Sequence, residues 1–286
     1  MKTLRMTIGV AIAACMLAAV FAAPSFAVKE PVIFGKFHAK ILGQTISPTS
    51  QGQTKGHGSI SEMRIGPYKF TGEKKNNPKT HQLEFGPICE KELTSKGLVS
   101  EEVSETFEQA MYFKKCIGYR KLGGGLEEPV IASFVIGVKF ASNFSAELGE
   151  PEVEIHGKGP LVIKAKKSFC EVTIPEQFIP LQAEEHPEKE FESASYTNEE
   201  ETLEGGKAKK YEGGVEKKLD IEMLFKKIHA NVKTSPQCHY TKEENGENEG
   251  LFNPDTGEVE YKSGLLEAEL EEITLKKGSV WFEPAA

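Results

Sequence analysis

The stretch that most constrains the fold runs from Pro129 to Gln182, PVIASFVIGVKFASNFSAELGEPEVEIHGKGPLVIKAKKSFCEVTIPEQFIPLQ. It holds the densest apolar and β-branched sequence in the chain, and glycine and proline interrupt it at short intervals. Strands at a spacing of about 8 to 10 residues, with turn residues between them, are typical of a sandwich or a barrel. Pro175 and Pro180 place Phe178-Ile179 at a sheet edge. The other predicted strands are Val130–Phe140, Phe144–Leu148, Val153–His156, Leu161–Ala165 and Phe169–Ile174.

The N-terminus has the features of a secretory signal peptide. Lys2 and Arg5 are basic, residues 7–23 are almost wholly apolar, and Ser25-Phe26-Ala27 supplies small residues for cleavage after Ala27. The apolar run is short for a membrane span, which takes about 20 residues. We therefore expect residues 1–27 to be removed. The mature chain is then secreted, extracellular or at the cell surface, with no membrane span.

A lipid-anchored protein is the alternative to the signal peptide. Ile12-Ala13-Ala14-Cys15 has the residue types of a lipoprotein processing site, and a lipidated Cys15 would anchor the chain to a membrane. The sequence after Cys15 stays apolar (MLAAVFAA), whereas an anchored chain normally turns polar there. This favours cleavage after Ala27.

The chain is acidic, with 43 acidic and 35 basic residues, and loss of Lys2 and Arg5 would make its formal charge of −8 more negative. Binding to nucleic acid needs a clustered basic surface. The short runs Lys74-Lys75 and Lys207–Lys210 stand beside glutamates, as in solvated loops. We therefore expect no nucleic-acid partner.

Export would remove Cys15 and leave four cysteines: Cys89, Cys116, Cys170 and Cys238. An even number of cysteines in an exported chain predicts two disulfides, for which three pairings are possible. An organisation in two halves favours Cys89–Cys116 and Cys170–Cys238. A metal site is the alternative, but the chain has no CxxC or CxxH spacing. We therefore expect structural disulfides, with no metal and no cofactor.

Further strands are predicted outside the central stretch. In residues 36–42, Phe37, Ala39 and Ile41 alternate with polar residues, which indicates a half-buried strand. The polar, glycine-rich residues 43–58 are expected to form a loop. The other predicted strands are 63–70, 82–85, 110–119, 265–275 and 279–283, the last of which holds the only tryptophan, Trp281.

Two segments raise the choice between strand and helix. Residues 90–110 have apolar side chains at loose helical spacing and Ser100 as a cap, so they are the best helix candidate of the first half. In residues 218–232 the apolar residues alternate as in a strand and then shift by one position. A β-bulge at Lys226-Lys227 would join the two runs, although a set of residues from Ile221 to Val232 also fits one helical face. The β-rich surroundings favour the bulged strand.

Two further segments are predicted from composition and turn residues. Residues 183–218 are dominated by glutamate and lysine, which predicts either a mobile exposed segment or a long polar hairpin. The segment Asn253–Glu258 (NPDTGE) lies between two apolar runs and predicts a hairpin turn.

The fold class that follows is mainly β: an antiparallel β-sandwich or barrel-like sheets, with few or no long helices after the signal peptide. The turn at residues 121–129, or the nearby 148–151, is the expected boundary between two β-rich halves. These halves are residues 28–128 and 129–286, each with two cysteines, and they could also form one continuous domain. The sequence leaves the oligomeric state open.

The residues that could carry chemistry form no catalytic or metal-binding pattern. No HExxH, HxH or carboxylate at ligand spacing accompanies the histidines, so we expect them at the surface or at strand ends. His156 beside Gly157 and His239 beside Cys238 are the most unusual. The seven histidines are His38, His57, His81, His156, His186, His229 and His239.

Motifs of other enzyme classes are missing as well. The chain has no GxSxG, and Gly123-Gly124-Gly125 lacks the rest of a phosphate-binding loop. Two disulfides would leave no cysteine nucleophile. Among 43 acids, carboxylate pairs occur by chance, so a glycosidase site cannot be recognised from sequence. The acidic segment 243–249 favours a solvated turn over a Ca²⁺ site.

Two segments carry a resemblance to a known group of proteins. These are Ser142–Glu150 (SNFSAELGE) and Phe169–Gln177 (FCEVTIPEQ). The chain resembles, over roughly its second half, uncharacterised secreted proteins that occur as large paralogous sets in soil actinobacteria. The resemblance implies export, a bacterial host and a Cys170–Cys238 pair, and it carries over no activity or site residue.

The function expected from the sequence is that of a non-enzymatic secreted or cell-surface β-protein. It would have a binding or structural role toward an extracellular or cell-wall ligand. The alternatives are a secreted hydrolase that uses carboxylates and a lipid-anchored binding protein. The four cysteines are the only site residues that the sequence predicts.

Overall fold

A computed structural model of the chain describes residues 35–41, 43–90, 93–121, 125–142, 152–165, 168–180, 193–202, 215–233, 238, 250–276 and 278–284. All regular elements in these residues are β-strands. They are β1 (Gly35–Ile41), β2 (Gly52–Ile65), β3 (Tyr68–Phe70), β4 (Lys74–Asn76), β5 (Leu83–Phe85), β6 (Leu93–Val99), β7 (Val103–Ser104), β8 (Thr106–Lys121), β9 (Glu127–Ala141), β10 (Glu152–Gly157), β11 (Leu161–Ala165), β12 (Phe169–Thr173), β13 (Gln177–Pro180), β14 (Ser193–Thr202), β15 (Val215–Lys233), β16 (Leu251–Asn253), β17 (Glu258–Leu275) and β18 (Gly278–Pro284). The described residues contain no helix that is long and apolar enough to cross a membrane.

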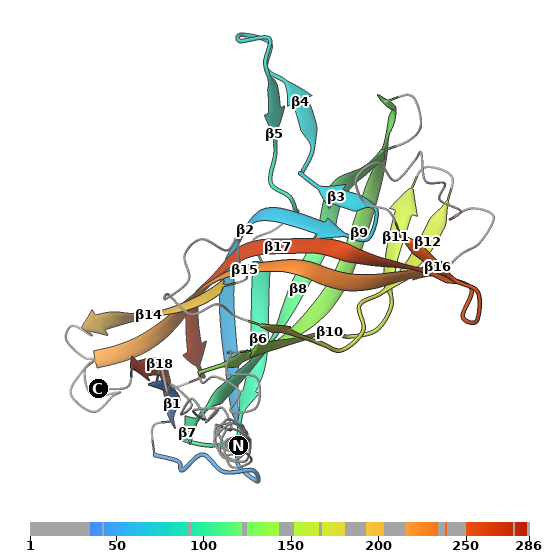
Figure 1. Cartoon of the computed structure of the whole chain (residues 1–286). Helices are drawn as coiled ribbons and strands as arrows, with labels where there is room; N and C mark the ends of the chain where they lie inside the picture. Colours follow the sequence, from blue (N-terminus) through green and yellow to red (C-terminus); the bar gives the residue numbers. More distant parts are fainter. Residues whose placement is uncertain are drawn as a thin grey trace, which may run out of the picture. The chain divides into compact units, whose positions relative to one another are not determined.

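The strands pair into one large antiparallel sheet that closes almost completely on itself (Figure 1). The order around the ring is β15-β12-β11-β9-β8-β3-β2-β17, and β17 pairs back to β15. Successive side chains of a strand point to opposite faces of the sheet. In β9 the inner set includes Val130, Ala132, Phe134, Ile136 and Val138, all of which are buried. The predicted mainly β, barrel-like fold is confirmed.

The strands β18, β1 and β7 continue the sheet beyond β17 and lie together near one end of β2, β6 and β8 (Figure 1). An aromatic cluster forms the core here. The ring of Phe37 in β1 lies 5.4 Å from that of Phe107, 4.9 Å from that of Tyr196 and 5.2 Å from that of Phe282, between centroids. Pairing of β18 with β1 fixes the C-terminal strand, as predicted.

Two side-chain amides bridge places where neighbouring strands do not pair directly. Gln177 in β13 accepts a hydrogen bond from the backbone N–H of His229 in β15 at 2.7 Å and donates one to its carbonyl oxygen at 3.0 Å. Asn198 in β14 does the same with Phe282 in β18, at 2.7 and 2.6 Å. Each amide therefore satisfies a backbone donor and acceptor that strand pairing leaves over.

Three of the longest strands contain β-bulges. In β15 the register shifts between Lys226 and Ile228, and Lys227 adopts a left-handed conformation with φ 57°. Lys115 in β8 (φ 47°) and Glu272 in β17 (φ 50°) lie at similar register shifts. The bulged strand predicted for residues 218–232 is confirmed, and the helical alternative is wrong.

Both predicted hairpins are present. β14 and β15 pair from Ser193↔Leu224 to Thr202↔Val215, which is the long polar hairpin predicted within residues 183–218. β16 and β17 flank the Asn253–Glu258 turn, in which the Gly257 N–H donates to the Asn253 carbonyl at 2.9 Å. A third hairpin, β4–β5, forms a separate two-stranded sheet that projects from the end of β3 (Figure 1).

Both predicted disulfides, Cys89–Cys116 and Cys170–Cys238, are present. Cys116, Ala132, Ile163 and Cys170 lie opposite one another on β8, β9, β11 and β12, so they form one cross-strand row of buried side chains. Each disulfide therefore links another segment of the chain to this one row of side chains.

Two predictions were wrong. Residues 52–58, expected in a loop, form the first half of β2. Their small residues allow close packing, since a Cβ at Gly58 would stand 1.8 Å from the carbonyl oxygen of Glu269. Residues 90–110, expected to be helical, contain β6, β7 and the start of β8. Leu98 and Val103 are exposed there, so the apolar residues do not share one helical face.

Several predicted features lie outside the described residues. They are the signal peptide 1–27 with Cys15, the strand Phe144–Leu148, Lys207–Lys210, His186, His239 and the acidic segment 243–249. Residues Pro31–Ala286 form one compact unit. Within it, β8 and β9 pair from Thr106↔Ala141 to Lys121↔Glu127, across the position where the two halves were expected to meet.

Candidate functional site

A pocket in the described part of the chain lies between β1, the end of β6, β7 and the start of β8. Its volume is about 240 Å³, which is smaller than the roughly 300–1,000 Å³ of most ligand sites in proteins. Five apolar residues line it: Phe37, Ala39, Leu98, Val99 and Phe107. All of them except Leu98 are buried, so they form its inner wall, while Leu98 is 56% exposed at the rim.

Strand pairing and turns hold this pocket in shape. Phe37 in β1 pairs with Ser104 in β7, and the Ala39 N–H donates to the Glu102 carbonyl at 2.9 Å. Ser104 Oγ accepts a hydrogen bond from the Thr106 N–H at 3.2 Å, which fixes the step from β7 to β8. The lining residues therefore come from segments far apart in the sequence that are fixed by main-chain contacts.

Polar groups complete the lining of the pocket. They include His38, Gln51, Glu101 and Glu108, together with hydroxyl groups from the β6–β8 segment. Both glutamates are exposed, and neither forms an ion pair with another described residue. No lysine or arginine is among the lining residues.

His38 connects the pocket with the tryptophan of the chain. Its imidazole stacks on the indole of Trp281, with centroids 5.2 Å apart and planes at 16°. Its Nε2 lies 3.2 Å from Oε2 of Glu283, so a carboxylate balances any positive charge on this ring. Lys217 Nζ in β15 lies 5.6 Å from the centroid of the Trp281 ring.

A buried polar bridge lies beside the pocket. Gln109 Nε2 donates to Thr54 Oγ1 at 2.8 Å, and both residues are almost fully buried. The amide crosses Gly97, where an added Cβ would meet Thr54 Oγ1 at 2.8 Å and the Glu108 carbonyl oxygen at 2.1 Å. Gly97 is therefore required for the contact between β2, β6 and β8.

The other described histidines do not converge on a common site. His57 lies 3.9 Å from both Glu271 and Glu272, His156 lies 3.8 Å from Glu154, and His229 lies 3.7 Å from Glu260. Each of these contacts is on the outer face of a strand. The described residues contain no group of three or more histidine, cysteine or acidic residues that could hold a metal ion.

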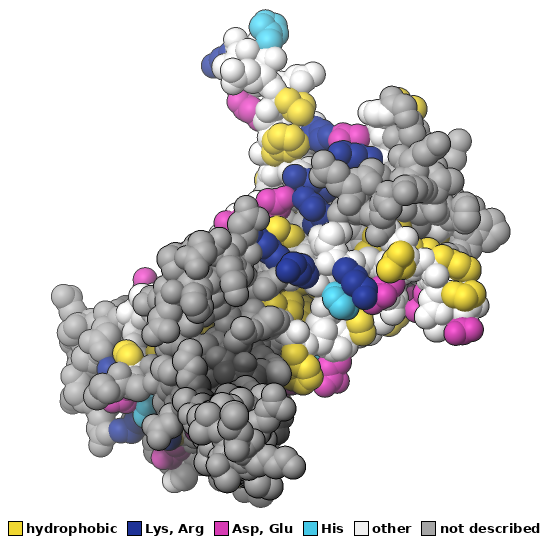
Figure 2. Space-filling view, viewed as in Figure 1, with side chains coloured by type: hydrophobic (Ala, Val, Ile, Leu, Met, Phe, Trp, Pro, Cys, Tyr) yellow, Lys and Arg dark blue, Asp and Glu magenta, His cyan; other side chains and the backbone are white. Residues whose placement is uncertain are grey.

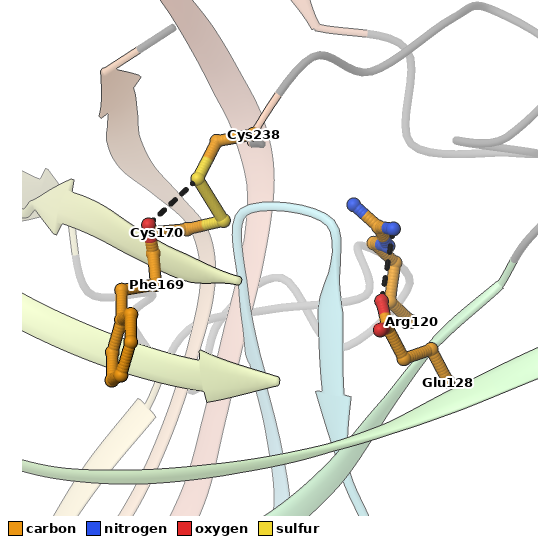
Figure 3. Close-up of a disulfide and its surroundings, with 5 residues drawn as sticks. All are labelled: Arg120, Glu128, Phe169, Cys170 and Cys238. Carbon is orange, nitrogen blue, oxygen red and sulfur yellow. Dashed lines mark hydrogen bonds and ion pairs between the residues drawn. A yellow bond between two sulfur atoms is a disulfide. The ribbon is translucent and has the colours of Figure 1, made fainter. Parts of the chain in front are cut away.

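Near the other end of the ring, Arg120 and Glu128 form an ion pair at 2.9 Å with side chains only 12% and 19% exposed. They face the same side of the sheet as the buried Tyr68, which is opposite Arg120. Figure 3 shows this pair and the Cys170–Cys238 bond, whose Cys238 Sγ contacts the Phe169 carbonyl oxygen at 3.0 Å. The ion pair and the disulfide stabilise this end of the ring of strands.

The outer face of β15 and β17 carries several carboxylates. Partial desolvation and repulsion from Glu271 and Glu222 raise the pKa of Glu269 above its ordinary value. On the same strand, a hydrogen bond from Lys218 lowers the pKa of Glu272. These pKa shifts have opposite signs because desolvation and neighbouring acids act on Glu269, whereas a neighbouring base acts on Glu272.

Exposed hydrophobic side chains mark a third region. Leu83 and Phe85 on the projecting β4–β5 hairpin are 51% and 52% exposed, and hydrophobic atoms are visible on this hairpin in Figure 2. Lys74 at its base contacts the ring of Tyr119 and the carboxylate of Glu127. The base of the hairpin is also held to β8 by main-chain hydrogen bonds, because the Gly72 N–H donates to the Ile117 carbonyl at 3.0 Å and the Ile117 N–H donates to the Ile88 carbonyl at 2.8 Å.

Of the residues predicted from sequence, the four cysteines form two disulfides that lie away from the pocket. His38 is the one predicted histidine that lines it. Phe37 and Ala39 come from the predicted strand at residues 36–42 and Gln51 from the predicted loop, while the other eight lining residues come from the segment that was expected to be helical. The alternation of Leu93, Ser95, Gly97 and Val99 was the signal that could have identified β6 and, with it, the pocket rim.

Comparisons with protein-family models, with curated proteins and with solved structures give no match for this chain.

Proposed function

We propose that this chain is an exported, non-enzymatic β-protein that binds a small extracellular or cell-wall ligand in the pocket between β1, β6, β7 and β8. The observation that carries the proposal is the pocket itself. It combines a buried apolar wall with seven polar residues, and such polar groups fix the orientation of a bound small molecule. Its size favours a ligand smaller than a typical drug molecule.

Export is proposed on two grounds. The N-terminal sequence predicts a signal peptide, and disulfides persist in oxidising compartments outside the cytosol. The resemblance to secreted actinobacterial proteins points the same way. Intact mass of the exported protein tests this: a chain beginning at Val28 supports it, and a lipid-modified chain beginning at Cys15 favours the anchored alternative.

Binding is tested by thermal unfolding of the exported protein with a panel of sugars, amines, carboxylates and short peptides. A ligand that binds the folded state raises the unfolding temperature. Ser100→Arg places a long side chain at the pocket, and Ser61→Arg on the exposed part of β2 is its matched control. We expect at least one compound to stabilise the wild type and Ser61→Arg but not Ser100→Arg. Equal shifts in all three proteins, or none, would contradict the proposal.

The hydrolase alternative rests on one observation, the presence of Glu101 and Glu108 in the same pocket. Two carboxylates are the minimal equipment of most glycosidases. If a panel compound is cleaved, mass spectrometry of the incubated compound will show its fragments. Cleavage that is lost in Glu101→Gln or Glu108→Gln would replace the binding proposal with a catalytic one.

A further inference from the structure

We infer that the ligand of this pocket is a cation, namely a primary amine on a short alkyl chain, such as the side chain of lysine or the end of a polyamine. This inference rests on the proposed binding function and adds the chemical class of the ligand. It follows from the charged residues at the pocket rim, from the apolar residues of the pocket wall and from the charge of the neighbouring residues.

The charged groups of the pocket favour a cation. Glu101 and Glu108 contribute carboxylates, while His38 is the only basic residue of the lining and already has Glu283 at 3.2 Å. An anionic ligand would face two like charges. A neutral ligand would cover the carboxylates and remove water from them without supplying a counter-charge.

The apolar wall suits the alkyl part of such a ligand. Phe37 and Phe107 stack at 5.4 Å and line the pocket side by side with Leu98. Because Phe37 and Phe107 are almost fully buried, a chain of a few methylene groups would pack mainly on Leu98, which is 56% exposed, and would bury apolar surface there. Its ammonium group would then reach the rim, where charge-assisted hydrogen bonds to the carboxylates form.

A neighbouring lysine does not cancel the charge of the rim. Lys139 is the cross-strand partner of Glu108, but its ammonium group lies 3.6 Å from Glu154 on β10. Lys139 therefore pairs with Glu154 and forms no ion pair with Glu108. The net formal charge of −8 for the whole chain adds long-range attraction for a cation.

The experiment compares three probes of equal chain length, n-butylamine, n-butanol and butyrate, at neutral pH and low salt. Trp281 is the only tryptophan of the chain and stacks on His38, one of the lining residues, so a ligand that moves the His38 ring or places a charge near it changes the fluorescence of Trp281. We expect saturable fluorescence changes with n-butylamine at concentrations at which n-butanol and butyrate give none. Added salt should weaken the response, because salt screens exposed charges.

Matched variants test whether the carboxylates at the pocket rim bind n-butylamine. Glu101→Gln and Glu108→Gln should each weaken n-butylamine binding about two- to fivefold, as expected for partly exposed ion pairs. Glu102→Gln, which changes the adjacent glutamate outside the lining, should bind like the wild type. Equal affinity of all three variants, or tighter binding of n-butanol than of n-butylamine, would overturn the inference.

Two further measurements are needed. One distinguishes a lysine side chain from a polyamine as the ligand, and the other distinguishes failure of the cation inference from failure of the proposed binding function. Titration with N-acetyl-lysine methylamide and with putrescine shows whether a lysine side chain or a polyamine binds more tightly. If panel compounds other than amines bind in a Ser100-dependent manner, the cation inference fails and the binding function stands. If no compound binds, both fail.

Discussion

Cys116 and Cys170 lie at opposite ends of one cross-strand row, joined through Ala132 in β9 and Ile163 in β11. Their disulfide partners come from different parts of the chain, at sequence separations of 27 and 68 residues. The row therefore connects two cross-links at one level of the ring.

Loss of the longer cross-link should cost more stability than loss of the shorter one. On the chain-entropy model, loops of these lengths contribute about 4.4 kcal/mol for Cys170–Cys238 and about 3.6 kcal/mol for Cys89–Cys116. Urea unfolding of the double variants Cys170→Ala/Cys238→Ala and Cys89→Ala/Cys116→Ala measures both. Unchanged stability in either variant would show that the corresponding bond is not formed.

Asn198→Ala should destabilise the protein by about 1–3 kcal/mol, because it leaves both the N–H and the carbonyl of Phe282 without their partner. The measurement is the free energy of unfolding in urea. Thr197→Ala, at the exposed neighbouring position, is the control and should change it by less than about 0.5 kcal/mol. Equal effects of the two substitutions would show that the amide does not bridge β14 and β18.

Lys227 occupies the left-handed position of the β15 bulge, which a β-branched residue adopts only at high cost. Lys227→Val should therefore lower the unfolding free energy by about 1–2 kcal/mol, and Lys227→Gly should be close to neutral. Lys226→Val, one residue earlier in the same strand, should be tolerated better than Lys227→Val. The opposite order would place the bulge elsewhere.

Glu269 and Glu272 should affect the pH dependence of stability in opposite directions. The pKa of Glu272 is lowered in the fold, so its contribution is present at neutral pH and is lost as the pH falls below 4.5 through the lowered pKa. Glu272→Gln should thus destabilise at pH 7, by about 0.5 kcal/mol since the side chain is 49% exposed.

The pKa of Glu269 is raised, so its ionised form costs stability at neutral pH, and protonation at acidic pH relieves that cost. Glu269→Gln should therefore stabilise slightly at pH 7, and the gain should vanish as the pH falls toward 4.5. Urea unfolding of the wild type and of both variants at pH 7 and pH 4 gives the free energies of unfolding to be compared. Changes of the same sign in the unfolding free energy of both variants at pH 7 would contradict the opposite pKa shifts of Glu269 and Glu272.

The sequence predicted most of the fold because its strands alternate apolar and polar residues or lie between prolines and glycines. The bulge at Lys226-Lys227 was recognised because the alternation resumes one residue out of phase. β11, predicted as Leu161–Ala165, has those bounds in the structure. In each case the local pattern and the tertiary packing agree.

The first half of β2 and the strand β6 were missed for a common reason. Residues 52–58 were interpreted as a loop and residues 90–110 as a helix, because small and polar residues such as Gly58, Ser95 and Gly97 interrupt the apolar alternation of a strand. These residues face neighbouring strands at distances that larger side chains would not allow. The small size of these residues is required by contacts between strands that are distant in the sequence, so a local sequence pattern does not reveal it. The pocket was missed with them, because its rim is formed by residues at the end of β6 and the start of β8.

The most direct test of the account is the location of ligand binding on the exported, disulfide-bonded protein. Two-dimensional ¹H–¹⁵N spectra would be recorded during titration with the panel compound that raises the unfolding temperature most. Binding in the pocket predicts amide shifts at Phe37–Ala39, Leu98–Glu101 and Ser104–Glu108, and none in the β4–β5 hairpin. Shifts centred on the hairpin or on the outer face of β15 and β17 would contradict it.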